Sequence, residues 1–403
     1  MVAASAPTNP GVVSYASALA KTQSDIAELR SIVARNRLDP EKRVRLAYRQ
    51  YHLASLTTAE DDYESVRRTI AGVIADFGPK EDICLLKASV DGHFHRLDDI
   101  KQDLQLCPGL ARRPAARLIS ADIDFQEGRY PEARTAIEAL IEEERTWDAL
   151  ARLAYWHGKM GNVTAADRLY EEASNELTAK EMSSYAWLEL QRGKLALSRG
   201  ARDRARSHFQ RAEASFPGHW STDAHWAGLL AAEGRLNEAV ELLEDVVSRA
   251  PKPELKQAIG EVLSLMGRDE EAGPYLEAAR KQFLDSVGKG GVHYFHHLAD
   301  FYADVGGDPA QAVEWARKDV ALRSNFATQS ALAWALHQAG EAREGLKWID
   351  DALSSGVQDS GIFATAAALC LADGDAERSE NFKRKADAIN PNEHGIHLHV
   401  VSF

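Results

Sequence analysis

Cysteine, catalytic signatures and long apolar runs are scarce or missing in this sequence. Only three cysteines occur, Cys84, Cys107 and Cys370, and no Cys-x-x-Cys pair joins any two of them. This spacing excludes a disulfide framework and a cysteine-based zinc site. We expect all three to be small buried side chains, and their thiols fit a reducing compartment.

Enzyme motifs are missing as well. The sequence contains no G-x-S-x-G, no H-E-x-x-H and no G-x-G-x-x-G. The glycine-rich stretch 288–291 lacks the spacing and the following hydroxyl residue of a phosphate-binding loop. We therefore assign no catalytic residue and expect a protein that is not itself an enzyme.

No apolar run is long enough to span a bilayer, and the net charge is −13. Because the apolar run is missing, we expect no membrane span. Because binding to a phosphate backbone requires a basic surface, we expect no nucleic-acid partner either. Residues 1–13 lack charge and a signal-peptide pattern, which predicts a disordered start and favours the cytoplasm. An exported protein is the alternative if this start is a processed end.

What the sequence does contain is a regular repeat of small residues. After Gly193 come Ala205, Phe209, Ala212 and the helix-stopping Pro217, at the spacing of two antiparallel helices. This skeleton resembles the tetratricopeptide repeat, a unit of about 34 residues. The resemblance implies that the small residues let two helices approach closely, while Phe209 fills the space between them.

The same register recurs on both sides of this unit. Residues equivalent to Ala205 recur at intervals of 33 or 34, with two longer intervals at the stretches 175–183 and 285–291, which we expect to be loops. Small residues equivalent to Gly193 are Ala88, Ala121, Ala154, Ala227, Gly260, Ala299, Ala333 and Ala367. One hairpin cannot bury its apolar face alone, so the repeats must stack.

This register predicts an all-α fold, a right-handed superhelix (solenoid) of about ten helical hairpins. We divide the chain into the disordered start (1–13), a capping helix (14–40), the repeats (41–391) and a histidine-rich tail (392–403). Two tryptophans of the first helices, Trp187 and Trp226, are expected in the core.

Histidines crowd the eighth repeat, 292–306. On one helix spanning this stretch, its histidines and Asp300 share a polar face. Imidazoles one turn apart beside a carboxylate are typical ligands of zinc, nickel or copper, and a polar face in water is the other interpretation. The candidate metal ligands, tail included, are His293, His296, His297, Asp300, His397 and His399.

The resemblance also implies a concave wall lined by fixed positions of each first helix. The wall residues that we expect to contact a partner are Tyr155, Lys194, Glu261, His293, His296, Asp300, Trp334 and His337. Trp334 is expected to point away from the core, where an exposed aromatic ring is a good contact residue.

These patterns favour a non-catalytic scaffold whose concave groove binds a protein or peptide segment, its own tail included. The first alternative is a metal-binding accessory protein that uses the histidines of the eighth repeat and the tail. The second is a subunit that positions a substrate within an enzyme complex. All three interpretations start from the fold, and a fold alone does not determine a function.

Overall fold

The computed structural model describes residues 13–391. These residues form 21 α-helices and one short 3-10 helix, and no strand occurs among them. The predicted all-α class is confirmed. The predicted disordered start, except for its last residue, and the histidine-rich tail lie outside the described residues.

Twenty of the helices pair into ten antiparallel hairpins. The first helices of the hairpins are α2 (Pro40–Thr57), α4 (Glu81–His93), α6 (Pro114–Gln126), α8 (Trp147–Lys159), α10 (Met182–Leu197), α12 (Trp220–Ala232), α14 (Pro253–Leu265), α16 (Phe295–Asp304), α18 (Phe326–Gln338) and α20 (Ser360–Ala372).

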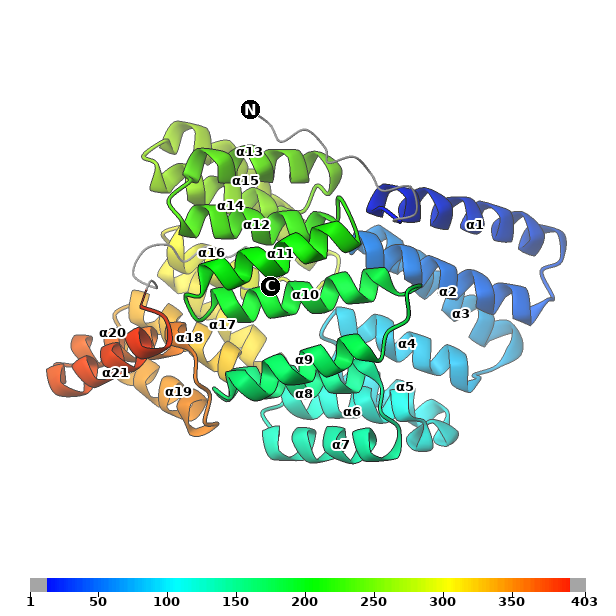
Figure 1. Ribbon diagram of the computed structural model, residues 1–403, viewed down its shortest axis with the longest axis horizontal. Helices are drawn as coiled ribbons and strands as arrows, with labels where there is room; N and C mark the ends of the chain where they lie inside the picture. The colour runs from blue at the N-terminus through cyan, green and yellow to red at the C-terminus, as the bar shows by residue number, and fades with distance from the viewer. Residues whose placement is uncertain (1–12, 392–403) are drawn as a thin grey trace.

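The second helices are α3 (Glu60–Phe77), α5 (Leu97–Leu106), α7 (Tyr130–Glu143), α9 (Val163–Asn175), α11 (Arg202–Ser215), α13 (Leu236–Arg249), α15 (Asp269–Gly288), α17 (Pro309–Leu322), α19 (Ala342–Ser354) and α21 (Ala376–Ile389). The helix α1 (Tyr15–Arg35) packs on α2, and the 3-10 helix η1 (Pro108–Arg112) follows α5. Figure 1 shows the hairpins following one another from the blue α1 to the red α21.

The small residues of the repeat are buried where the two helices of a hairpin meet. Gly193, Ala205 and Ala212 are buried, and Phe209 is fully buried between them. All the residues equivalent to Gly193 are buried too. The physical reason is the close approach of the two helix backbones, which leaves room for one large ring and little else.

Two glycines in helices provide a test of this packing. A Cβ atom at Gly193 would lie 2.2 Å from a ring carbon of Phe209. Because this ring is fully buried, Gly193→Ala should lower the free energy of unfolding by about 1–3 kcal/mol, measured by urea denaturation. At Gly273, inside α15, a Cβ atom would meet nothing within 4 Å. Gly273→Ala should therefore stabilise the chain by about 0.5–1 kcal/mol, and equal effects of the two changes would contradict the packing argument.

Two local expectations about the eighth repeat are wrong. The stretch 285–291 is not all loop, because α15 continues to Gly288 and its last turns bury Phe283 and Ser286. The histidine-rich helix does not begin at residue 292, because α16 starts at Phe295. His293 therefore precedes the helix instead of lying on its face.

The superhelix turns back on itself, so that residues far apart in the sequence meet. Side-chain hydrogen bonds join partners separated by 164 to 226 residues. We call this contact, between residues 56–159 and residues 220–359, the seam. At one end of it, Trp220 Nε1 donates to the carbonyl of Leu56 (3.1 Å) and Lys252 Nζ donates to the carbonyl of Thr58 (3.1 Å).

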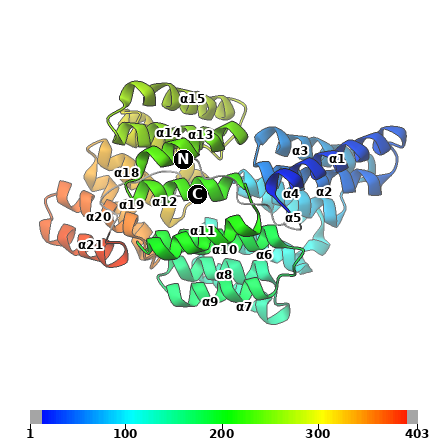
Figure 2. The same ribbon diagram turned by 45° about the horizontal axis from the view of Figure 1, so that its top comes forward.

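The seam continues along the next hairpins. The hydroxyl of Tyr130 accepts from the backbone N–H of Phe326 at 2.7 Å, and the two rings stack with their centroids 5.3 Å apart. Further on, the carbonyl of Lys159 accepts from the backbone N–H of Gln358 at 2.9 Å. Figure 2 shows the blue α1–α3 and the green α13–α15 as separate stacks.

Candidate partner-binding surface

Each first helix has a side that packs in the core and another side that we call the inner row. On α14, Leu255 and Ile259 belong to the core, whereas Glu254, Gln257 and Glu261 follow each other at helical spacing on the inner row. Gln257 Nε2 donates to Glu261 Oε1 at 2.7 Å. Glu254 Oε2 and Gln257 Oε1 are buried and accept no hydrogen bond. This row therefore holds polar groups whose bonding is incomplete.

A basic cluster lies on the inner row of α8 and α10. Tyr155 is 44% exposed, and Lys159 Nζ lies 5.8 Å from the centre of its ring. Lys159 also pairs across the seam with Asp359, at 3.5 Å between Nζ and Oδ2. Arg199 Nη2 donates to the carbonyl of Gly158 at 2.7 Å. One carboxylate thus faces several cations here.

Lys194 is the cation of this cluster that lacks a counter-ion. Its side chain makes no ion pair and no hydrogen bond to any residue between 13 and 391. Burial, and then the nearby charge of Lys159, lower the pKa of Lys194 to about 7. A partly buried ammonium group without an acid costs free energy, which an anionic group of a ligand would recover.

The histidines of the eighth repeat point in different directions. His293 Nε2 lies 3.0 Å from Glu60 Oε1 across the seam, and His296 Nδ1 lies 3.2 Å from Arg323 Nη2 within its own hairpin. The predicted shared polar face is wrong for His297, which is 6% exposed. Its ring stacks on Phe283 with the centroids 5.3 Å apart and the planes at 8°.

The predicted metal site is not assembled by the described residues. Within 13–391, no group of three or more His, Cys, Asp or Glu side chains is arranged to hold a metal ion. Asp300 is partly buried on α16. His397 and His399 lie outside the described residues, so the metal site stays a prediction.

Trp334 and His337 form a contact of their own on α18. The expectation that Trp334 points away from the core is wrong, because it is partly buried against the core around Leu332 and Leu336. Its Nε1 donates to Asp304 Oδ1 at 2.8 Å, and its ring stacks on that of His337 at 5.2 Å. Burial lowers the pKa of His337.

Sequence reasoning missed several residues of these surfaces and misplaced Trp187, besides His297 and Trp334. Trp187, expected in the core, is 43% exposed and touches Trp147 edge-on, with the centroids 6.1 Å apart. Lys159 and Asp359 were not singled out, because nothing in either repeat signals a partner one superhelical turn away. His93 was also missed, although it lies in an H-F-H stretch, and its ring centre is 6.4 Å from that of His293.

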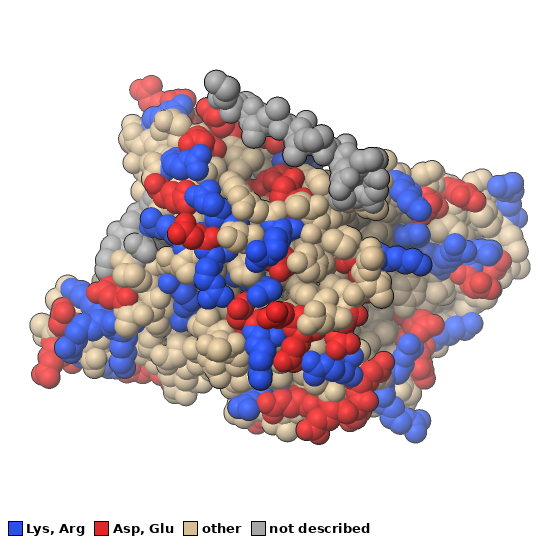
Figure 3. All heavy atoms as spheres, in the orientation of Figure 1, with Lys and Arg blue, Asp and Glu red and all other residues tan. Residues whose placement is uncertain are grey.

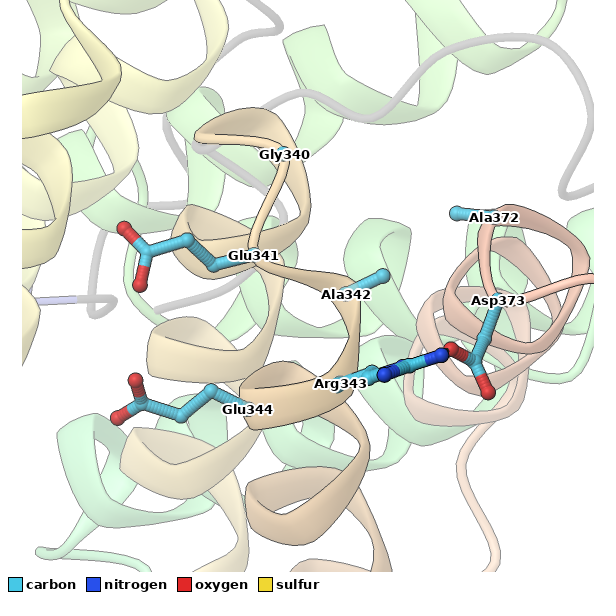
Figure 4. A pocket seen from close by; sticks show the side chains of 7 residues that line it. All are labelled: Gly340, Glu341, Ala342, Arg343, Glu344, Ala372 and Asp373. Carbon is cyan, nitrogen blue, oxygen red and sulfur yellow. The ribbon is translucent and has the colours of Figure 1, made fainter.

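Figure 3 shows one face of the molecule, on which acidic and basic side chains are interleaved. A shallow pocket between the hairpins of α19 and α20 is lined by Gly340, Glu341, Ala342, Arg343, Glu344, Ala372 and Asp373. Figure 4 shows Arg343 reaching across it to Asp373, with Nε and Oδ1 3.1 Å apart, while Glu341 and Glu344 point away. Of the helices between residues 13 and 391, none has the length and apolarity needed to cross a bilayer.

Comparison with a family model agrees with the repeat pattern over part of the chain. Residues 196–262 match a family model described as tetratricopeptide repeat. The chain is similar to the crystal structure of a tetratricopeptide repeat protein from Parabacteroides merdae, at 13% identity over 64% of this chain and 96% of that one, with a TM-score of 0.37. It is also similar to the crystal structure of the APC/C hetero-tetramer Cut9-Hcn1, at 14% identity over 96% of this chain and 93% of that one, with a TM-score of 0.39. No curated protein sequence matches the chain.

Proposed function

Because the chain is built of stacked helical hairpins and matches the tetratricopeptide repeat over residues 196–262, we propose that it is a non-catalytic scaffold whose inner row binds an extended segment of a protein partner. Stacked first helices repeat the same positions along one wall, and an extended peptide meets such positions one after another. The chemical character of the inner row supports this proposal. The inner row carries exposed aromatic rings and polar groups with incomplete bonding.

The single observation that carries the proposal is Lys194. Its ammonium group lies near the cation of Lys159, which in turn lies 5.8 Å from the centre of the exposed ring of Tyr155, and it has no described counter-ion. A carboxylate of the partner would pair with Lys194 and raise its pKa again, and an apolar group next to that carboxylate would cover the ring of Tyr155. The partner segment should therefore combine an acidic and an apolar side chain.

A random peptide library displayed on phage tests this function directly. Peptides selected on the wild-type chain should be enriched in Asp or Glu next to an apolar residue. Their affinity, measured by fluorescence anisotropy, should fall at least about tenfold for Lys194→Met, because a charge-assisted hydrogen bond is lost. Lys347→Met, on the exposed face of α19, is the matched control and should bind as the wild type does. Selected peptides that bind Lys194→Met with full affinity would refute the proposal.

The two alternatives stay predictions. A metal-binding accessory protein needs His293 and His296, which contact Glu60 and Arg323. A subunit that positions a substrate in an enzyme complex would use the same inner row, and its partner would be an enzyme instead of a peptide ligand. Neither alternative has an observation of its own comparable to Lys194.

A further inference from the structure

The seam closes the superhelix around the inner row. Trp220 and Lys252 bind carbonyl groups of the first superhelical turn, and Arg96 Nη2 donates to the carbonyl of Gly290 at 3.1 Å. The turns therefore touch from the hairpin of α2 to that of α8. A partner segment that is flanked by folded domains on both sides cannot thread into a closed ring.

The inner row is correspondingly hidden at several places. Gln257 is fully buried and Glu261 is 6% exposed, although both lie on the inner row of α14 and not in the hydrophobic core. The unbonded acceptors at Glu254 and Gln257 are costly in this closed arrangement, since buried polar atoms lose water without gaining a partner. An open arrangement would return these atoms to water or to a ligand.

The seam is also thin compared with the stacking of neighbouring repeats. Each helix packs along its length against the next helices in the chain, whereas no helix between residues 13 and 391 packs extensively against a helix one turn away. The seam combines single polar contacts, such as Trp220 with the carbonyl of Leu56, with two apolar clusters, one that holds Tyr130 with Phe326 and one that holds Leu56 with Phe216. Because no pair of helices between residues 13 and 391 packs extensively across it, the seam permits relative motion of the parts that it joins.

We propose that the seam is a latch: the chain exchanges between a closed ring and an open superhelix, and the open form admits the partner segment. Opening breaks the contacts of the seam, among them the hydrogen bonds to the carbonyls of Leu56 and Thr58, the pair of Tyr130 with Phe326 and the pair of Lys159 with Asp359, and leaves the hairpin stacking intact. The apparent dissociation constant for a ligand of the open form is then the intrinsic constant divided by the fraction of chains that are open. The latch rests on the proposed function for its partner, but the opening itself can be measured without any partner.

The first experiment measures the distance across the seam. Spin labels at Asp98→Cys and Lys289→Cys, both at exposed positions, flank the bond from Arg96 to Gly290. The native cysteines are buried and should stay unlabelled. The distance distribution of the wild type should show a major short component and a minor long one.

A double variant should shift this balance. Trp220→Phe with Lys252→Met removes two seam donors while keeping an aromatic ring and an aliphatic chain in place. Two hydrogen bonds of about 1 kcal/mol each correspond to a ratio of open to closed chains raised roughly thirtyfold. Trp226→Phe with Lys256→Met makes the same changes on the same two helices away from the seam and should leave the ratio unchanged. The far-UV circular dichroism should be the same in all three proteins.

Several results would overturn the latch. One is a distance distribution that the double variant leaves unchanged. Another is an equal shift in the control variant, and a third is a longer distance that appears only together with a loss of helicity.

A second experiment separates the latch from the proposed function. A cleavable bis-maleimide linker that joins the thiols of Asp98→Cys and Lys289→Cys holds the seam closed within one chain. The linked protein should bind the library-selected peptides at least about tenfold more weakly than the same protein after cleavage. Equal binding before and after cleavage would refute the latch and leave the scaffold proposal standing. If no peptide binds either form, the scaffold proposal fails, and the label distances still decide whether the seam opens.

Discussion

Replacement of Lys87 by Met should lower the free energy of unfolding by about 3 kcal/mol. Lys87, on α4, binds two carboxylates at once, with Nζ 3.0 Å from Asp91 Oδ2 and 2.6 Å from Asp103 Oδ1. The side chains of Asp91 and Asp103 are only 1% and 3% exposed. Removal of the cation leaves two buried acids that repel each other, and one oxygen of each already lacks a hydrogen-bond partner.

The loss should depend on pH, because burial raises the pKa of Asp103 to about 6. Between about pH 4 and pH 6 the folded chain holds a proton that the unfolded chain has released, so stability from this group falls as the pH rises through that window. Without Lys87 the pKa of Asp103 should rise further. The deficit of Lys87→Met relative to the wild type should therefore be larger at pH 8 than at pH 5.

Urea denaturation at both pH values measures this effect, with Lys101→Met as the control. Lys101 lies in the next helix and pairs with Glu127, but its side chain is 40% exposed. Exposed ion pairs contribute about 0–1 kcal/mol, so this control should lose little. Equal losses in the two variants, or a deficit of Lys87→Met that does not grow with pH, would contradict the argument.

The contacts within each hairpin could be predicted from the sequence because they repeat. Gly193 and Ala205 meet at a spacing set by the length of one hairpin, and the same spacing recurs along the chain. Phe209 could be placed because a large apolar residue between two small positions has one space to fill. These contacts join residues of one hairpin, so the sequence of each repeat shows their pattern.

The seam could not be predicted in the same way. Whether Trp220 reaches Leu56 depends on a small rotation per repeat that accumulates over a whole superhelical turn, and no residue type encodes that rotation. The error at His297 has a local cause. His297 lies one helical turn before Phe301, and both residues are on the buried side of α16, where the ring of His297 stacks on Phe283.

Lys194→Met should have the opposite effect on stability from Lys87→Met, although the substitution is the same. Lys87 neutralises two acids, whereas Lys194 has Lys159 as its nearest charge and no described acid. Exchange of an uncompensated cation for an apolar side chain of similar length should raise the melting temperature by about 2–4 °C. The same variant should lose the peptide binding described above.

The pH dependence separates this explanation from a general benefit of a larger apolar side chain. Because the pKa of Lys194 is lowered to about 7, the unfolded chain binds a proton between pH 7 and about 10.4 that the folded chain has lost. The wild type is thus penalised fully at and below pH 7 and recovers as the pH rises through that window. The advantage of Lys194→Met should be largest at pH 6.5 and should shrink by pH 9.5.

Calorimetric melting at the two pH values, with Lys347→Met as the control, makes the comparison. A pH-independent gain would mean that packing, not charge, accounts for the stability. A loss of stability in Lys194→Met would mean that the lysine has a structural role, and the basic cluster would then not be a binding site. A gain that shrinks with pH, together with lost binding, is the combination expected of a residue kept for its ligand at the expense of the fold.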